Sequence, residues 1–460
     1  MSFLHGVEVV EIDGGPRPIS TVASSVIGLV GTAKKGPVNQ PVLITGSRKQ
    51  AIDAFGLPDG SSTIPDALNA IFDQGGAMVV VINVQAKQSI AATDYSLVDG
   101  AVELKHSYVS ELFVTGQSEA GETLTYQQGR DFTIASQAGV NGKDELRLTL
   151  TSGIDPTATL SVAYSVASDT PATKAQLVSS KNPDGGIPGL LGAESKVKVT
   201  PRMLIAPGFS DDVDVVNAMI TVADRLRAIV IADGPDTTDT ASIDFRQNFD
   251  SARLYIVDPQ VLVFDSVSNS DVLQPASSRV AGIIAKSDNE RGFWWSPSNR
   301  TMLGINGTSR AIDFTLGDKL ARANLLNDNE VATIIHQNGY RLWGNRSCAS
   351  DPKFAFISVR RTADLINDSL LRAHLWAVDR NITKTYIDDV TEGVNDYLRH
   401  LKTVGAIIDG KCWADPELNT PAQIAQGKVF FDFDFTPPYP AEHITFRSRL
   451  TNDYLEEMFA

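Results

Sequence analysis

Short apolar runs alternate with amphipathic stretches from about residue 20 to residue 85. The runs at 26–30, 42–44 and 79–82 consist of aliphatic residues and one glycine. Because a strand that is covered on both faces shows no polar alternation, such runs are typical of buried strands. Helix-like stretches at 49–55 and 65–74 separate them. The pattern predicts an α/β layer.

The same texture returns after residue 200. We expect strands at 202–206, 228–232 and 254–257, with helices at 213–226 and 241–249 between them. Strands that alternate with helices in this order form a mainly parallel sheet with right-handed crossovers. The first α/β segment is expected to join this sheet, so that one mixed sheet with flanking helices forms the body.

Residues 88–168 differ from both segments, because they are rich in Ser, Thr, Gly and Tyr and alternate with a period of two. Short strand candidates lie at 101–105, 112–114, 122–126, 131–134, 145–150 and 158–164. Such spacing, with turn residues between the strands, is typical of a small sandwich or barrel. The sequence therefore predicts an inserted all-β domain that is closed by the Pro- and Gly-rich stretch 182–189.

The last third of the chain contains two long helix candidates, at 362–378 and 386–404. In the first, an apolar stripe and a charged stripe lie on different faces, which predicts an amphipathic helix. The apolar stripe is Leu365, Ile366, Leu370, Ala373 and Ala377, and the charged stripe is Asp364, Asp368 and Arg372.

Both ends of the chain contain strand-like segments. The N-terminal candidate is formed by Val7, Val9, Val10 and Ile12, before a link at 13–18 with two prolines and two glycines. Near the other end, Val429, Phe431, Phe433 and Phe435 alternate with Asp432 and Asp434, and Ile444, Phe446 and Ser448 alternate with Thr445, Arg447 and Arg449. An exposed strand either docks on its own molecule or completes a neighbour's sheet. Both alternatives are open at this point.

Charge and cysteine content exclude several classes of protein. The 460 residues carry 40 Lys and Arg against 55 Asp and Glu, a net charge of −15 without a basic cluster. Nucleic acid is not an expected partner, because each neutralised phosphate requires a cation. Two cysteines are too few for a disulfide scaffold or a Cys-rich metal site. No secretory signal and no apolar run long enough to cross a bilayer is visible, so we expect synthesis and retention in the cytoplasm, without membrane insertion.

Motifs for catalysis or cofactor binding are also missing. The glycine-containing stretch 31–36 is followed by Pro37 where a phosphate loop needs its lysine. The six histidines are scattered, and neither a G-x-S-x-G elbow nor an H-E-x-x-H helix occurs. The adjacent carboxylates Asp388 and Asp389 do not face each other on a helix, so a solvated face explains them better than acid–base chemistry. We expect no catalytic residue, no metal site and no cofactor.

Several blocks of sequence resemble one known family. Leu4 to Ile12 and Arg17 to Thr21 resemble the opening of contractile tail sheath proteins, especially those of P2-like bacteriophages and R-type tail bacteriocins. The similarity continues, in family order, at 39–45, 198–204, 245–249, 339–346, 373–379 and 431–437. It covers nearly the whole chain except about 86–190, where the β-rich stretch resembles an extra outward domain.

The resemblance implies a structural subunit and not an enzyme. Such subunits form stacked six-fold rings around an inner tube, assemble extended, and shorten after triggering at the baseplate, which drives the tube through a bacterial envelope. The implied partners are further copies of the chain, the inner tail tube protein, and the baseplate and tail terminator proteins. The implied location is the virion tail, after assembly in the host bacterial cytoplasm.

The resemblance also implies roles for parts of the chain. Terminal arms would be exchanged between subunits as added strands: Val7 to Ile12 at one end, and Phe431 to Phe435 with Ile444 to Arg449 at the other. The implied division is an N-terminal arm and linker (1–19), a body in two parts (20–87 and 191–350), the insertion (88–190), a helical part facing the tube (351–427) and a C-terminal arm (428–460). Candidates for tube contact are Asp388, Asp389, Glu392 and Arg399, for which ordinary exposed helix charge is the simpler interpretation.

Two alternatives remain open. The sheath of a non-phage injection system would contract by the same mechanism, and its subunits would be recycled. A partner ATPase and a neighbouring second sheath component would indicate this alternative. A soluble α/β enzyme would need a pocket with clustered titratable groups, which a turnover screen would reveal.

Overall fold

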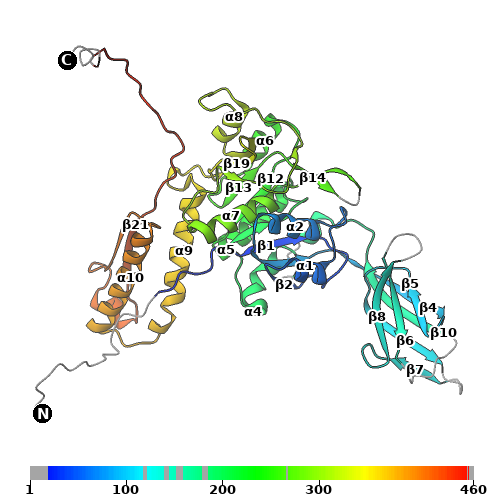
Figure 1. The fold of residues 1–460 in the computed structure, drawn as a ribbon. Helices are drawn as coiled ribbons and strands as arrows, with labels where there is room; N and C mark the ends of the chain where they lie inside the picture. Colours follow the sequence, from blue (N-terminus) through cyan, green and yellow to red (C-terminus); the bar gives the residue numbers. More distant parts are fainter. Residues whose placement is uncertain are drawn as a thin grey trace, which may run out of the picture.

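The computed structural model describes residues 19–117, 122–138, 144–151, 159–178, 185–265, 268–452 and 454. The predicted N-terminal strand with Val7, Val9, Val10 and Ile12 lies outside the described residues. The chain has a mixed α/β fold, as expected, with a sheet-and-helix body, a β-rich lobe at one end and a helical lobe at the other (Figure 1).

A nine-stranded sheet forms the centre of the body. Its strands, in spatial order, are β16 (Arg300–Thr301), β19 (Tyr340–Trp343), β18 (Val331–His336), β13 (Leu254–Val257), β12 (Ile229–Asp233), β11 (Met203–Ile205), β1 (Ile27–Gly31), β3 (Met78–Asn83) and β2 (Pro41–Thr45). The strands from β3 to β18 run parallel, and both edges are antiparallel. The first α/β segment thus joins the same sheet as the second through the pair β1–β11.

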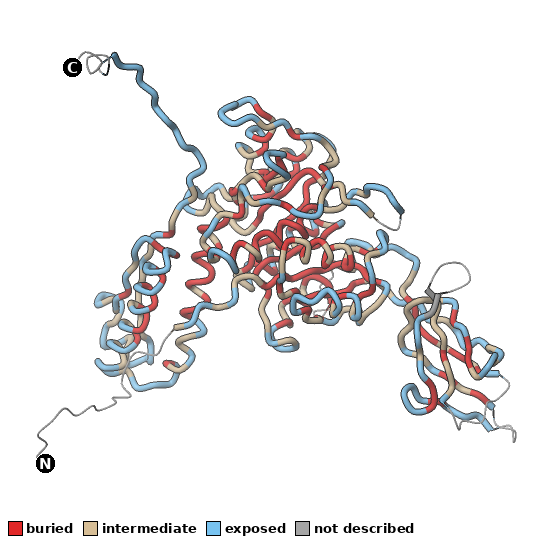
Figure 2. Tube along the Cα trace, in the orientation of Figure 1, coloured by how far each residue is buried: buried red, intermediate tan, exposed pale blue. Residues whose placement is uncertain are grey.

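Helices cover both faces of this sheet, which explains why its strands are continuous apolar runs. One face packs against α1 (Arg48–Phe55), α2 (Thr63–Gln74) and α7 (Ser277–Arg291). The other face packs against α3 (Lys174–Val178), η1 (Pro188–Gly192), α4 (Ala193–Val197), α5 (Val213–Leu226), α6 (Asp239–Arg246) and α8 (Arg322–Asp328). Figure 2 shows the resulting buried centre. A small sheet of β14 (Val261–Asp265), β15 (Ser270–Gln274) and β17 (Gly307–Thr308) stands beside it.

The β-rich lobe contains two sheets with a core of their own. One sheet is β4 (Lys87–Ser96), β10 (Thr159–Ala167), β6 (Ser110–Gln117) and β7 (Thr123–Tyr126), and the other is β5 (Ala101–Leu104), β9 (Asp144–Leu150) and β8 (Phe132–Ala138). Val102, Leu104 and Leu148 from the second sheet pack with Val114 and Val162 from the first. The lobe joins the body through β4 and β10, whose last pair is Lys87 with Ala167.

The helical lobe follows residue 350. Its elements are η2 (Pro352–Phe354), α9 (Ile357–Ala373), η3 (Leu375–Ala377), α10 (Lys384–Val404), β20 (Asp409–Ala414), α11 (Pro421–Ala425) and β21 (Phe431–Thr436). Apolar residues of α9, α10 and β21 share one core, which also takes in Phe293 and Ile19.

Two helices differ from the prediction at both ends. Helix α9 begins five residues before the predicted start at 362 and ends at Ala373, where the His374 side chain contacts the carbonyl oxygen of Leu370 at 2.7 Å. Helix α6 begins and ends earlier than 241–249, because Thr238 accepts a hydrogen bond from the backbone N–H of Ala241 as N-cap.

Candidate assembly surfaces

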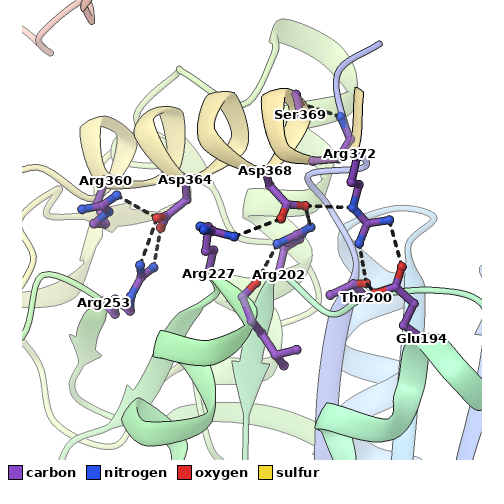
Figure 3. A network of polar contacts seen from close by, with 12 residues as sticks. Glu194, Thr200, Arg202, Arg227, Arg253, Arg360, Asp364, Asp368, Ser369 and Arg372 are labelled. Atoms are coloured by element: carbon purple, nitrogen blue, oxygen red, sulfur yellow. Dashed lines mark hydrogen bonds and ion pairs between the residues drawn. The ribbon is translucent and has the colours of Figure 1, made fainter. Parts of the chain in front are cut away.

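Helix α9 joins the helical lobe to the body through buried ion pairs (Figure 3). Asp364 accepts hydrogen bonds from Arg253 at 3.0 Å and from Arg360 at 2.7 Å. Asp368 binds Arg202, and it accepts a further hydrogen bond from Arg372 at 3.0 Å. Asp364 and Asp368 of the predicted charged stripe therefore face the body, where Arg253 and Arg202 bind them, whereas Arg372 is exposed.

These contacts gather charged side chains from α9 and from the starts of β11 and β13 in a region that is largely shielded from water. Burial lowers the pKa of the Arg202 guanidinium from its ordinary value, and the Asp368 carboxylate opposes that shift. Arg202 also donates to the carbonyl oxygen of Leu226 at 2.6 Å, and Arg227 lies 3.4 Å from Asp368. The opposite side of α9 packs with α10 through Leu365, Ile366 and Leu370. Helix α9 is thus covered on both sides, by the body and by the helical lobe.

The segment that leads from the N-terminus is held between α9 and α10. Ile19 and Val22 pack against the core of the helical lobe. The hydroxyl groups of Thr21 and Tyr397 lie 3.0 Å apart, and the backbone N–H of Val22 donates to the Ser369 hydroxyl at 3.1 Å. Residue 19, where the described part of the chain begins, therefore lies beside these two helices.

Strands β20 and β21 form a two-stranded antiparallel sheet on α10. Phe431, Phe433 and Phe435 of β21 pack against the core of their own lobe. Within the single chain β21 pairs with β20, and the exchange of these three residues between subunits stays a prediction. Strand β20 is not among the predicted strands, because Gly410 and Lys411 interrupt the apolar pattern.

The outer edges of this sheet are not equivalent. On β20, the Asn395 side chain binds both backbone groups of Cys412: it accepts from the N–H at 2.8 Å and donates to the carbonyl oxygen at 3.1 Å. Those groups cannot serve a further strand at the same time. Among the residues that the structure describes, β21 pairs with no strand other than β20. The edge of β21 is therefore the better acceptor for an added strand.

The chain after β21 is anchored only in part. Arg346 donates to both carboxylate oxygens of Glu442, at 2.8 and 2.6 Å, and the ring of Tyr439 packs edge-on against Phe356. Beyond that point the chain is extended and leaves the body (Figure 2). Ile444 and Phe446 are 67% and 92% exposed, and the neighbouring Arg447 and Arg449 are exposed as well.

The exposed face of α10 is acidic. Asp388, Asp389, Glu392 and Arg399, which the sequence singled out, are all exposed on this helix. Arg399 binds Asp396, a residue that was not among the predicted candidates. Its guanidinium nitrogen Nη2 also lies 3.5 Å from the Glu392 carboxylate oxygen Oε2. The helix carries four exposed carboxylates, Asp388, Asp389, Glu392 and Asp396, against the exposed cations Lys384, Arg399 and Lys402, so it retains a small excess of negative charge.

The described part of the chain offers neither a metal site nor an activated thiol. No group of three or more His, Cys, Asp or Glu residues there could hold a metal ion. Both cysteines are buried, and burial raises the pKa of Cys348 to about 12 and that of Cys412 to about 11. None of the helices in the described ranges has the length and hydropathy to cross a bilayer.

Three family descriptions match consecutive parts of the chain. They are the tail sheath protein Gp18 domain III N-terminal region at residues 24–84, the phage tail sheath protein central domain at 188–348, and the phage tail sheath C-terminal domain at 349–451. The unmatched interval of 85–187 contains the β-rich lobe.

Full-length relatives agree with this assignment. The chain is 39% identical to a prophage major tail sheath protein of Pseudomonas aeruginosa, over 100% of this chain and 99% of the relative. It is 34% identical to the tail sheath protein of Burkholderia phage BcepMu and 33% identical to that of Escherichia phage P2, in both cases over 99% of this chain and 98% of the relative. The chain therefore belongs to the phage tail sheath family. It is a subunit of a contractile tail sheath, and the family predicted from the sequence blocks is confirmed.

Solved structures with little sequence similarity have the same fold. The sheath of an extracellular contractile injection system in the contracted state, called PVC, has a TM-score of 0.61 at 14% identity, over 98% of this chain and 99% of that one. The contracted helical sheath of the anti-feeding prophage also has a TM-score of 0.61, at 17% identity, over 98% and 100% of the two chains.

Proposed function

We propose that this chain polymerises into a helical sheath of stacked six-membered rings around an inner tail tube, and that contraction of this sheath drives the tube through a bacterial envelope. A heterologous contact that repeats along a screw axis gives an open helical array. The observation that carries the proposal is the combination, among the described residues, of an open sheet edge on β21 with the exposed segment 443–450 in the same chain.

Strand exchange would connect the subunits. In this proposal Ile444 to Arg449 of one copy, and Val7 to Ile12 of another, extend β20–β21 sheets of their neighbours. Backbone ladders depend little on side-chain identity, whereas alternating apolar side chains such as Ile444 and Phe446 fix the register. Because the donated segments are linked to the body by extended chain, neighbours would stay connected while the bodies rotate during contraction.

The acidic face of α10 is our candidate for tube contact. Exposed charges form modest, salt-sensitive contacts, and such contacts suit a partner that must be released when the sheath shortens. Asp388, Asp389 and Glu392 would face the inner tube protein, and Arg399 would position this cluster through Asp396. The residues from 351 to 427 would then be the tube-facing part of the subunit.

The remaining parts have roles that follow from this orientation. The β-rich insertion, at the end of the body opposite the helical lobe (Figure 1), would project outward from the sheath. Baseplate and tail terminator proteins would contact the end rings, and assembly would take place in the host bacterial cytoplasm. We propose no catalytic activity for the subunit, since assembly itself would supply the work of contraction.

Electron microscopy of the purified full chain tests the central proposal. Hollow cylinders of regular diameter are expected when protein and salt concentrations are raised. Monodisperse particles under all these conditions would count decisively against helical self-assembly. A cylinder reconstruction in which both chain ends fold onto their own subunit would retain the sheath and eliminate strand exchange.

A further inference from the structure

An apolar patch lies on the outer face of the β14–β15 hairpin. Val261 and Val263 point toward the body core, so Leu262 and Phe264, which alternate with them, point away from it. Leu262 pairs with Leu273, and Phe264 pairs with Asp271. Phe264 is 55% exposed and Leu273 is 51% exposed. The hairpin thus presents an aromatic ring, flanking aliphatic side chains and a carboxylate on one surface.

A hollow of about 330 Å³ lies at the edge of the nine-stranded sheet. Phe314, Leu316, Ile335 and Trp343 give it an apolar lining, and Arg341 supplies a cation. Phe314 and Trp343 pack edge to face with ring centres 4.9 Å apart. Leu316 is 72% exposed beside them. An aromatic side chain next to a carboxylate fits such a lining.

The hairpin and the hollow lie on opposite faces of the sheet. Val261 belongs to the core on the α7 side, together with Ile334. Ile335 follows Ile334 along β18, and it belongs to the core on the α5 side with Phe314 and Trp343 packed against it. Since neighbouring residues in a strand point to opposite faces, one molecule can offer its hairpin on one side and its hollow on the other. Two different surfaces on one chain are what a repeating head-to-tail contact requires.

The charges of the two surfaces are complementary and unmatched within the chain. Arg341 donates to neutral oxygens, the carbonyl oxygen of Gln337 at 2.9 Å and that of Asn299 at 3.1 Å. Asp271 accepts from the Asn306 side-chain amide at 2.8 Å. Arg341 and Asp271 form no ion pair with any residue that the structure describes. An intermolecular contact between Arg341 and Asp271 would give each charge an oppositely charged partner.

We infer that the β14–β15 hairpin of one subunit docks in the Phe314–Trp343 hollow of a second copy, with Phe264 inside the hollow and Asp271 beside Arg341. This inference rests on the proposed helical assembly and gives it a body-to-body contact besides the exchanged strands. Truncating a central aromatic anchor typically weakens an interface far more than truncating a peripheral residue.

A matched pair of variants tests this contact between the hairpin and the hollow. Phe264→Ala should raise the protein concentration needed for cylinders about tenfold or more. Phe113→Ala, which removes a ring of nearly equal exposure (56%) from the insertion, should leave it unchanged. Asp271→Arg and Arg341→Glu should each impair assembly, and the double variant should restore it. Thermal unfolding of each purified variant must match that of the unmodified chain.

Crosslinking provides a second test, and buried native cysteines give it a low background. Ser270→Cys combined with Gln337→Cys should yield ladders of linked subunits with a short bis-maleimide reagent, whereas Ser89→Cys with Gln337→Cys should not. If cylinders form without such ladders, and the Phe264→Ala variant assembles normally, the hairpin-to-hollow contact is wrong but the proposed helical assembly is retained. If the unmodified chain forms no cylinders, both proposals fall.

Discussion

Arg202, at the start of a central strand, binds Asp368 in α9 at a point where the two side chains are only 6% and 8% exposed. Removing one partner of a buried ion pair leaves the other charge unpaired in a poorly solvated place. We therefore expect Asp368→Ala to lower the free energy of unfolding by about 3–5 kcal/mol. Urea denaturation followed by circular dichroism measures this loss.

The control is an exposed ion pair of the same body. Asp214, whose side chain is 68% exposed, lies 2.8 Å from Lys174. Asp214→Ala should leave the free energy of unfolding nearly unchanged, because solvent screens this pair. The double variant Arg202→Met with Asp368→Leu should be more stable than Asp368→Ala alone. Equal losses for Asp368→Ala and Asp214→Ala would show that α9 is not held by its buried charges.

Tyr397 should control how firmly the N-terminal segment is held. Tyr397→Phe removes the hydroxyl group that meets Thr21 and leaves the packed ring in place. A hydrogen bond of this kind contributes about 1 kcal/mol. Amide hydrogen exchange of residues 19–25 should accelerate accordingly. Tyr386→Phe, which loses a bond to the Ala377 carbonyl oxygen, should leave that exchange unchanged.

Removal of residues 1–15 should separate folding from assembly. The described body begins at residue 19, so the truncated chain should keep its far-ultraviolet circular dichroism spectrum and unfolding temperature. It should form no cylinders, because one of the two donated strands is gone. A second variant that lacks the residues after Glu442 should likewise fold but form no cylinders. Normal cylinders from either truncated protein would refute the role of that arm.

The insertion should be removable without loss of the body fold. Gln85 donates to the carbonyl oxygen of Ser168 at 2.6 Å, and Gln88 pairs with Val166, so these residues should be kept. Replacing 89–165 by Asn-Gly closes the two strands with a two-residue hairpin turn. The product should unfold as cooperatively as the full chain. Aggregation of the shortened body under conditions where the full chain is monomeric would show that the lobe is integral to it.

Charge reversal on α10 tests the tube contact. The double variant Asp388→Lys with Glu392→Lys should reduce binding of the inner tube protein. Binding by the unmodified chain should weaken as the salt concentration rises from about 50 to about 300 mM, because the screening length then falls to a few ångströms. Asp94→Lys with Glu103→Lys, in the insertion, carries the same change in charge. Co-sedimentation with preassembled tubes compares the two. Equal binding by both double variants would leave the α10 charges as ordinary exposed residues.

Much of the body could be predicted because its strands are covered on both faces. The runs around Leu29, Val81 and Ile231 therefore lack polar residues, and helices between them indicate the crossovers. The insertion was visible through the change to alternation by two. In both cases the local pattern reports directly which faces are buried.

Other features depend on residues far away in sequence. The charged stripe of α9 resembles a solvated face, because its partners Arg202 and Arg253 lie more than a hundred positions earlier. The start of α9 was missed for a similar reason: Arg361 is buried against Asp288. Strand β20 has too few apolar residues to be recognised, and its partner β21 determines it.

Lys87 and Ala167 stand opposite each other where the insertion enters and leaves the body. A module attached through two adjacent points can be exchanged, enlarged or lost without displacing either neighbouring element. In the orientation proposed above, engineered peptides or fluorescent proteins placed between these residues would be displayed on the outside of the sheath, at one copy per subunit.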